Sequence, residues 1–296
     1  MNGINSAPKP AVSSSAAMAP SYQTISLESK GPIVILTFCR PNVLNALTPQ
    51  LMLEVSDALT RIAHDQDIRG IVLTGQGRAF CAGADLTGVR VGKSSKAGQE
   101  QVPEKLLPRM DMGALWNPIT TQIHEMPKPV VCAVNGVAAG AGCGLAVSGD
   151  VTVMNREAEF VLTFVPKIGL IPDLGTTWHF PRRMGRGAAL PHALLGTPIS
   201  AEKALQTGLI YEVADGPEAT LNRAVEIAQT LASGSIPAIL ATREAFDAAT
   251  RNSFADQLGF ERKEQMKLFA NSESKRVSRA HLEKHGNKQK KQQSRL

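Results

Sequence analysis

One stretch constrains the fold of this chain more than any other: Gly136–Asp150, with the sequence GVAAGAGCGLAVSGD. Gly and Ala supply nine of its fifteen residues, and no charged side chain precedes Asp150. The apolar run before it, Val130–Val134, is typical of a buried strand, and Gly140 to Gly144 favours the start of a helix. The first amides of a helix have no partner inside it, so this segment is expected to present free N–H groups.

A second segment of small residues, Arg78–Asp85 (RAFCAGAD), also follows a predicted strand. Its small residues allow the backbone to approach a ligand closely, although a tight turn alone would also explain it. Two backbone donors from two such loops, directed at one carbonyl oxygen, would form an oxyanion hole. Together the two segments indicate an enzyme that stabilises an enolate or a tetrahedral oxyanion.

The net charge of +6 does not indicate a nucleic-acid-binding face. Six cations near the two ends account for all of it: Lys9, Lys284, Lys288, Lys290, Lys291 and Arg295. Residues 10–283 are therefore close to neutral, and a basic RNA-binding surface on the folded body is not expected. The four cysteines have no CxxC or Cx(n)H spacing, so we predict no metal site and a reducing compartment.

Short apolar runs alternate with helical patterns along the chain, which predicts an α/β fold. The expected strands are 32–38, 70–74, 130–134, 151–154 and 160–163. Thr48 and Pro49 are typical of a helix start, and the apolar residues that follow recur on one face: Leu51, Met52, Val55, Leu59 and Ile62. Further helices are expected at 200–208, 218–232, 236–249 and 253–271.

The same patterns divide the chain into four parts. Residues 1–20 are expected to be a disordered tail, 21–199 the core, 200–285 a helical C-terminal region and 286–296 a basic flexible tail. Residues 88–113 are polar and interrupted by Gly and Pro, which indicates a long loop beside a site. No apolar run approaches the ~20 residues that span a bilayer, so a soluble protein is expected.

Five motifs in a fixed order resemble the crotonase, or enoyl-CoA hydratase/isomerase, superfamily. They are RPNVLNAL from Arg40, GRAFCAGAD from Gly77, KPVVCAVNG from Lys128, the segment from Gly136 and GLIPDLGT from Gly169. The resemblance runs from about Ser26 to Lys284. It implies coenzyme A thioesters as substrates with no separate cofactor, a spiral of ββα units with a C-terminal helical trimerisation region, and homotrimers or homohexamers.

The resemblance also implies roles for particular residues. The backbone amides of Ala84 and Ala141 would be the oxyanion donors, and the carbonyl group of Ala82 would meet the adenine of coenzyme A. The other implied substrate contacts are Gly83, Leu86, Gly140, Gly144 and Phe164. The phosphates of coenzyme A need cations, for which Arg40 and Lys284, from the same or a neighbouring subunit, are candidates; both are equally consistent with solvated surface charges.

The two acids of the family's hydratases are missing. Hydratases carry a glutamate where this chain has Gly144, and the equivalent of their second glutamate is Thr163, Phe164 or Val165. None of these side chains ionises near neutral pH, yet hydration needs one group to activate water and another to deliver the proton. Efficient hydration is therefore not expected. Gly144 and Ala141 instead suggest space for a bulky, branched or ring-bearing acyl chain.

Among the five matched motifs, one carboxylate remains as a candidate catalytic acid: Asp173 of the GLIPD run. The matching position holds a proton-moving acid in dienoyl-CoA isomerases, and the ring-epoxide isomerase of phenylacetate degradation has a similar run without the hydratase glutamates. Asp173 is therefore the candidate base that moves a proton between two carbons, with Phe164 and Val165 as an apolar wall that raises its pKa. The alternative is a helix N-cap that satisfies backbone donors near Thr176.

The remaining polar candidates are interpreted as structural. Asp85 and Asp150 each follow a turn of small residues. His124 is interpreted as a packing or surface residue, and His179 as a core or interface residue, with an acyl pocket as the alternative. Cys143 is interpreted as a small buried residue, although a thiol near a helix start can have a lowered pKa.

The leading functional hypothesis is an acyl-CoA isomerase that acts through an enolate. One alternative is an enoyl-CoA hydratase or an acyl-CoA hydrolase in which Glu104 or Asp111 replaces the absent acids. The other is a non-catalytic homologue that binds coenzyme A or RNA. In a eukaryote, Ser294-Arg295-Leu296 would be a close variant of a peroxisomal address; otherwise the tail is a solvated end and a cytoplasmic location is expected.

Overall fold

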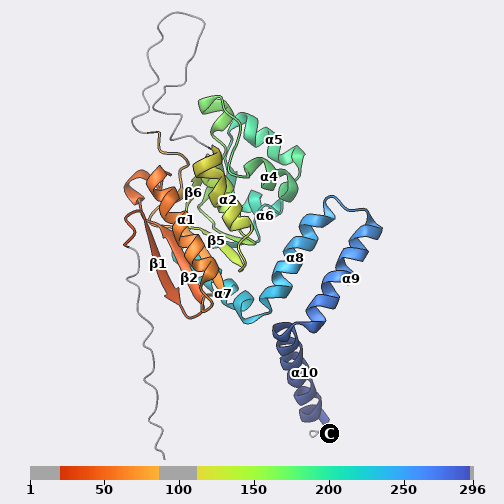
Figure 1. Ribbon diagram of the computed structural model, residues 1–296. Helices are drawn as coiled ribbons and strands as arrows, with labels where there is room; N and C mark the ends of the chain where they lie inside the picture. Colours follow the sequence, from red (N-terminus) through yellow and green to blue (C-terminus); the bar gives the residue numbers. More distant parts are fainter. Residues whose placement is uncertain (1–20, 87–111, 294–296) are drawn as a thin grey trace, which may run out of the picture.

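A six-stranded sheet forms the centre of the body, shown in Figure 1. The structure is a computed structural model that describes residues 21–86 and 112–293, with side chains described as far as residue 284. The strand order is β1-β2-β3-β5-β7-β10. The strands are β1 (Ile25–Lys30), β2 (Ile33–Phe38), β3 (Gly70–Gly75), β5 (Val130–Val134), β7 (Val151–Asn155) and β10 (Glu212–Ala214).

A second, four-stranded sheet has the order β4-β6-β8-β9. Its strands are β4 (Ala79–Cys81), β6 (Val137–Ala139), β8 (Glu159–Val161) and β9 (Ile199–Ser200). Neighbouring strands are parallel except for β1 with β2 and β8 with β9, which are antiparallel. Each of the pairs β3–β4, β5–β6 and β7–β8 therefore places its first strand in one sheet and its second strand in the other.

A helix follows each of these strand pairs. The helices are α2 (Asn117–His124), α3 (Ala141–Ala146) and α4 (Thr176–Met184), with single π-helical turns η3 (Met112–Trp116) before α2 and η4 (Phe164–Ile168) before α4. The repeat is thus strand, strand, helix, and successive repeats add parallel strands to both sheets. The predicted α/β spiral of ββα units is confirmed.

The alternation of side chains along the strands produces two cores, one on each face of the larger sheet. Ile33 and Ile35 of β2 face helix α7 (Pro217–Ser233), whereas Val34 and Leu36 face the space between the sheets and helix α1 (Pro49–His64). The N-cap of α1 is Thr48, whose Oγ1 accepts a hydrogen bond of 3.2 Å from the amide of Leu51. The predicted start and apolar face of this helix are confirmed.

The predicted boundary at residue 199 does not separate two units. Strand β10 completes the six-stranded sheet beside β7, and α7 covers its outer face, so both belong to the body. The sequence pattern alone could not show this, because α7 reads as one more amphipathic helix and its sheet partner comes from much earlier in the chain. The remaining short elements are η1 (Pro41–Val43), which follows β2, and α5 (Arg186–Leu195) and α6 (Ala201–Gln206), which lie on either side of β9.

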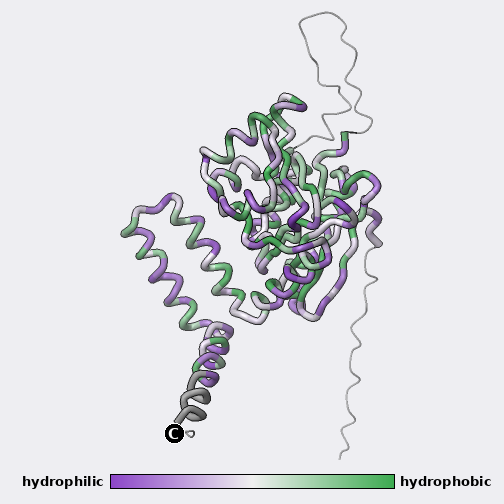
Figure 2. The backbone as a smooth tube through the Cα atoms, turned by 180° about the vertical axis from the view of Figure 1, so that it is seen from behind, coloured by the Kyte–Doolittle hydropathy of each residue, from purple (hydrophilic) through white to green (hydrophobic). Residues whose placement is uncertain are grey.

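Three helices leave the body as an arm, visible at the lower right of Figure 1: α8 (Ile236–Ala249), α9 (Phe254–Ala270) and α10 (Ser272–Gln293). Arg69 fixes the base of the arm, because its guanidinium donates to the carbonyl groups of Ala232 and Gly234 and pairs with Glu273. In the part of α10 that Figure 2 colours, hydrophilic residues predominate. The helix continues past the boundary predicted at residue 285.

Two predicted segments lie largely outside the described residues: the N-terminal tail and the polar loop at 88–113. Within the described part, no single helix has the length and apolar character to cross a bilayer. Helices α7 and α8 meet the criteria of length and apolar character only when they are taken together, and that pair is bent by 106°.

Candidate active site

The two segments of small residues pack against each other backbone to backbone. A Cβ atom on Gly136 would lie 2.1 Å from the carbonyl oxygen of Arg78, and one on Gly142 would lie 2.2 Å from that of Cys81. Distances under 3.0 Å essentially never occur for real Cβ atoms. Glycines are therefore needed here because another main chain occupies the place of their side chains.

Buried asparagines hold the two loops in this arrangement. The side-chain amide of Asn135 donates to the carbonyl groups of Gly77 (2.8 Å) and Ala79 (3.2 Å), and its oxygen accepts from the amide of Gly75 (3.1 Å). Asn45 donates to the carbonyl of Ala79 at 2.8 Å. Neither residue was singled out from the sequence, where Asn135 beside Gly136 signals only a turn and Asn45 gives no signal.

The predicted oxyanion donors lie at the contact between the loops. A Cβ atom on Gly83 would be 3.2 Å from the nitrogen of Ala141 and 2.8 Å from the carbonyl oxygen of Ala139, so the two loops touch there. Within the described residues, neither the amide of Ala84 nor that of Ala141 donates a hydrogen bond. Gly83 has φ +88° and Gly140 has φ +52°, both in the left-handed region, so the course of each loop itself favours glycine.

The structure places Thr163, one of three candidates for the second hydratase position, beside this contact. Its Oγ1 lies 3.3 Å from the position that a Cβ atom on Gly140 would take. Phe164 is 3% exposed and packs in the main core, and Val165 is on the surface. The group nearest the oxyanion loops at this position is therefore a hydroxyl that does not ionise near neutral pH.

The expected space at Gly144 is absent. A Cβ atom there would lie 2.3 Å from the carbonyl oxygen of Leu174 and 2.9 Å from Oγ1 of Thr176. The prediction that Gly144 leaves volume for a bulky acyl chain is therefore wrong, whereas its contact with the substrate stays a prediction. The sequence showed that a side chain was missing, but not that the turn after Asp173 fills its place.

That turn carries Asp173, which lies beside α3 as predicted. Its carboxylate raises the pKa of the Cys143 thiol electrostatically, after the larger effect of burial on that thiol. One carboxylate oxygen, Oδ1, is buried and accepts no hydrogen bond from any described residue. Burial raises the pKa of Asp173 from 3.8 to about 6, because the charged form loses its hydration.

The alternative role of Asp173 as a helix cap is wrong. The N-cap of α4 is Gly175, which has φ +77°, and no side chain caps the helix. The main-chain carbonyl of Asp173 accepts from the amide of Thr176 at 2.9 Å, which leaves the carboxylate free of that task. A carboxyl group whose pKa is close to neutral pH therefore lies against the short helix α3, which begins at the predicted oxyanion donor Ala141.

The cations proposed for the phosphates are not both available. The guanidinium of Arg40 pairs with Asp85 at 2.9 Å and donates to the carbonyl of Ala46, so its charge is already neutralised inside the protein. Arg40 and Asp85 thus form a structural pair, which confirms the interpretation of Asp85 and argues against Arg40 as a phosphate ligand. Lys284 is exposed on the arm, which points away from its own body, so only a neighbouring subunit's Lys284 remains a candidate.

Two further residues that the resemblance implies as substrate contacts, Ala82 and Leu86, are accessible on the same loop. Ala82 is half-buried, and among the described residues nothing donates a hydrogen bond to its carbonyl group. Leu86 is 46% exposed at the edge of the described chain. Both lie on the loop of Ala84, where a bound thioester would pass.

The other polar candidates are structural, as predicted. Asp150 accepts from the amide of Val130 and pairs with Arg243, each at 2.8 Å. Cys143 is fully buried, and burial raises the pKa of its thiol, so the option of a lowered pKa is wrong. Among the residues that the structure describes, no group of His, Cys, Asp and Glu side chains is arranged to hold a metal ion.

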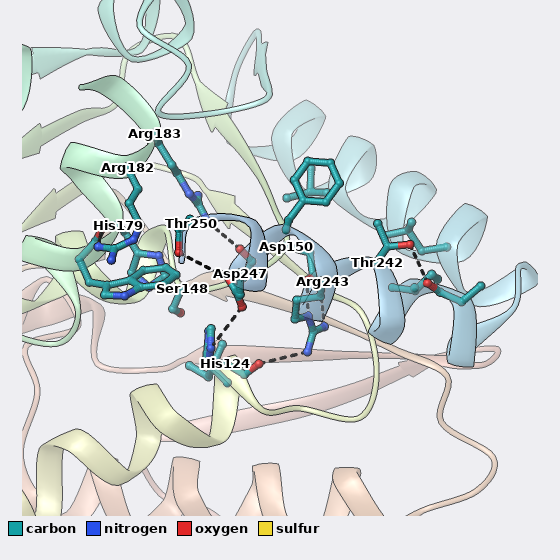
Figure 3. A pocket seen from close by; sticks show the side chains of 18 of the residues that line it. His124, Ser148, Asp150, His179, Arg182, Arg183, Thr242, Arg243, Asp247 and Thr250 are labelled. Atoms are coloured by element: carbon teal, nitrogen blue, oxygen red, sulfur yellow. Dashed lines mark hydrogen bonds and ion pairs between the residues drawn. The ribbon is translucent and has the colours of Figure 1, made fainter. Parts of the chain in front are cut away.

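A groove of about 740 Å³ lies apart from this site, between the body and α8 (Figure 3). His124, on α2, lies 3.6 Å from Asp247 of α8, and its ring packs edge to face on Trp178. His179 also lines the groove but is 5% exposed, which supports its interpretation as a core residue. None of Ala84, Ala141 and Asp173 lines the groove, so it belongs to the attachment of the arm.

Comparisons with known proteins agree with this fold. The family model described as enoyl-CoA hydratase/isomerase matches residues 28–292. The 1,2-epoxyphenylacetyl-CoA isomerase of Escherichia coli is 39% identical over 78% of this chain and 84% of its own. A probable enoyl-CoA hydratase of Rhodobacter capsulatus is 36% identical over 89% of this chain and 96% of its own. Among solved structures, an enoyl-CoA hydratase from Polaromonas has a TM-score of 0.77 and 31% identity, and covers 88% of this chain and 97% of its own.

Proposed function

Because this chain belongs to the enoyl-CoA hydratase/isomerase family, and is thus an acyl-CoA enzyme, we propose that it isomerises its substrate through an enolate. The observation that carries the proposal is the pairing of two free backbone donors with one acid. Asp173 has a pKa of about 6 and lies against the helix that begins at Ala141. No second carboxylate stands at the positions of Gly144 and Thr163.

In the proposed reaction, the amides of Ala84 and Ala141 bind the thioester carbonyl oxygen. The ionised carboxylate of Asp173 removes a proton from a carbon next to the thioester or conjugated with it, and the electron pair of that C–H bond moves to the carbonyl oxygen. The enolate is held by the two amides. The neutral carboxyl group then returns the proton to a different carbon, so that a double bond shifts and no atom is gained or lost.

The pKa of Asp173 suits both halves of this cycle. Near neutral pH the group is mostly ionised and accepts a proton, yet its protonated form is only about one pH unit away. A surface carboxylate with a pKa near 4 would be a weaker base by about two units. Burial without a hydrogen-bond partner at Oδ1 therefore supports a role in proton transfer.

The substrate that we propose is an enoyl-CoA or a ring-bearing acyl-CoA. The support for a ring is the similarity to the 1,2-epoxyphenylacetyl-CoA isomerase, not a cavity, because the space beside Gly144 is filled. The support for an enoyl group is the similarity to proteins named as enoyl-CoA hydratases.

Proton exchange tests the proposal without knowledge of the true substrate. The enzyme is incubated with phenylacetyl-CoA in D2O and the thioester is analysed by mass spectrometry, with Asp173→Asn as the variant. We expect deuterium at the α-carbon with the wild-type enzyme and a rate lower by about 10²-fold or more with the variant. Exchange that survives in the variant would remove Asp173 as the base.

A hydratase or a hydrolase is the second candidate, favoured by the relatives that carry hydratase names. It would need an acid from outside the described residues, for which Glu104 and Asp111 are the sequence candidates. Hydration of crotonyl-CoA that disappears in a Glu104→Gln or Asp111→Asn variant would establish it. A purely binding role would instead show thioester binding without any turnover, and RNA binding that is lost when residues 286–296 are deleted.

A further inference from the structure

The turn after Asp173 has an unusual backbone. Only three described residues other than glycine have positive φ, and one of them is Leu174, at +46°. Gly175 follows with φ +77°, so two consecutive left-handed residues reverse the chain between Asp173 and α4. A leucine rarely adopts this conformation unless its surroundings impose it.

Two contacts impose it here. The side chain of Leu174 is 2% exposed and packs in the main core, and its carbonyl group lies against Gly144 of α3. The carbonyl oxygen is only 2.3 Å from the place that a Cβ atom on Gly144 would occupy. No side chain of any kind therefore fits at residue 144 while the turn keeps this course.

Helix α3 separates two parts of the site through its two glycines. Gly142 faces the carbonyl of Cys81, on the loop of Ala84, and Gly144 faces the carbonyl of Leu174, on the turn of Asp173. The thickness of a bare helix therefore sets the distance between the loop of Ala84 and the turn of Asp173. A methyl group on either glycine would displace one part relative to the other.

We propose that Gly144 and Leu174 are positioning residues for Asp173, and that a side chain at residue 144 and an inward carboxylate at residue 173 exclude each other. The catalytic role in this inference rests on the proposed function, whereas the position of the Asp173 carboxylate can be measured without it. In a Gly144→Ala variant the turn moves off α3 and carries the carboxylate toward water.

The experiment measures the pKa of Asp173 by a carbon NMR titration of its carboxyl group. Four proteins are compared: wild type, Gly144→Ala, Gly142→Ala and Leu174→Gly. Asp173→Asn identifies the signal. We expect a value that falls toward the ordinary value for Asp in Gly144→Ala and Leu174→Gly, and that stays at the wild-type value in Gly142→Ala, the matched control on the opposite side of α3. An unchanged pKa in both Gly144→Ala and Leu174→Gly would overturn the proposal.

Activity gives a second, separate readout. In Gly144→Ala the pH profile of α-proton exchange should shift to lower pH and its maximum rate should fall about tenfold or more, with little change in thioester affinity. Gly142→Ala should lower the rate without moving the profile. If the wild-type enzyme exchanges no protons, the proposed function fails, whereas the NMR titration still decides whether Gly144 positions Asp173. If Gly144→Ala does not fold, Leu174→Gly, which adds no atoms, still decides it.

Discussion

Asp173 is held where its charged form is unfavourable, so its presence lowers the stability of the protein at neutral pH. The pKa is raised from 3.8 in the unfolded chain to about 6 in the folded one. A raised pKa means that the folded state binds the proton more tightly than the unfolded state. The stability associated with this proton is present below pH 4 and is lost as the pH rises through 6.

The Asp173→Asn variant should therefore be more stable than the wild type above pH 6, by at most about 3 kcal/mol, and equally stable near pH 4. Chemical unfolding at several pH values measures the difference. Asp85→Asn is the matched control: its carboxylate pairs with Arg40 at 2.9 Å, so that variant should be less stable at neutral pH. A destabilised Asp173→Asn protein at pH 7 would contradict the assigned environment.

His179 makes the opposite contribution. Burial, with the charges of Arg183, His124 and Arg182 as smaller causes, lowers its pKa from 6.5 to about 3. The unfolded chain binds the proton first, so stability is complete above pH 6.5 and is lost as the pH falls toward 3.

A His179→Phe variant should remove part of this acid sensitivity, because it has no proton to bind. The slope of unfolding free energy against pH between 6.5 and 4 should be lower than in the wild type by up to about 1.4 kcal/mol per unit. At pH 7 the variant should be near wild type, since Nδ1 of His179 has no hydrogen-bond partner among the described residues. His64, on the surface, is the control position for this comparison.

At the scale of residues, the sequence indicated candidate groups but not what surrounds them. Ala84 and Ala141 lie on two loops that touch at Gly83, and Asp173 lies beside the helix that begins at Ala141. Gly144 was interpreted as open space, because a sequence shows the lack of a side chain and not the main chain that fills its place. Leu174 gave no signal at all, since its left-handed conformation is imposed by contacts with residues thirty positions earlier.

At the scale of elements, the loops that carry the oxyanion donors are held by side-chain amides instead of by long strands. Strands β4 and β6 have only three residues each, too few to stabilise the loops that follow them. Asn135 makes three hydrogen bonds to main-chain groups of the segment 75–79 and is 6% exposed. It therefore connects the end of β5 to the other loop.

An Asn135→Ala variant should lose about 2–4 kcal/mol of stability, because main-chain groups of Gly75, Gly77 and Ala79 lose a buried partner. Proton exchange into the thioester should fall as well, since Ala84 lies on the loop that is released. Unfolding curves and the exchange assay measure the two effects. Asn252→Ala, at an exposed site, should change neither; equal effects of the two variants would contradict the role of Asn135.

The elements themselves could be predicted from the sequence where they are long or strongly periodic. The strand at 130–134 and the helix at 236–249 have the expected bounds. The strands β4, β6, β9 and β10 were missed, because two or three residues carry no alternation, and β1 was missed although it pairs with β2 over six residues. Most residues of β1 are exposed, so the period that marks a buried face is weak there.

At the scale of the whole molecule, the arm leaves large apolar side chains uncovered. Phe246, Phe254, Met266, Phe269 and Leu282 are each between 63% and 80% exposed. Apolar surface of this extent usually marks an interface. We therefore propose that the arms of neighbouring copies cover it, in the homotrimer or homohexamer that the family resemblance implies.

Light scattering after size-exclusion chromatography tests this assembly. The wild-type protein should have about three or six times the chain mass of 31.5 kDa, and a variant with Phe254→Glu and Phe269→Glu should have a lower mass. Leu53→Glu is a control, since Leu53 is 62% exposed on α1, away from the arm. A monomeric wild-type protein would contradict the proposal.

The contact between Gly144 and Leu174 also limits how this enzyme can change over evolutionary time. Because a side chain at residue 144 would clash with the carbonyl of Leu174, we expect a carboxylate introduced there to displace the turn of Asp173, so that the intermediate variant has neither acid in place. Improvement of a second activity at this site therefore cannot proceed through that substitution alone. We therefore expect the two positions to be epistatic, so that a lineage that passes between one acid and two rebuilds the turn at 173–175 and the helix at 141–146 together.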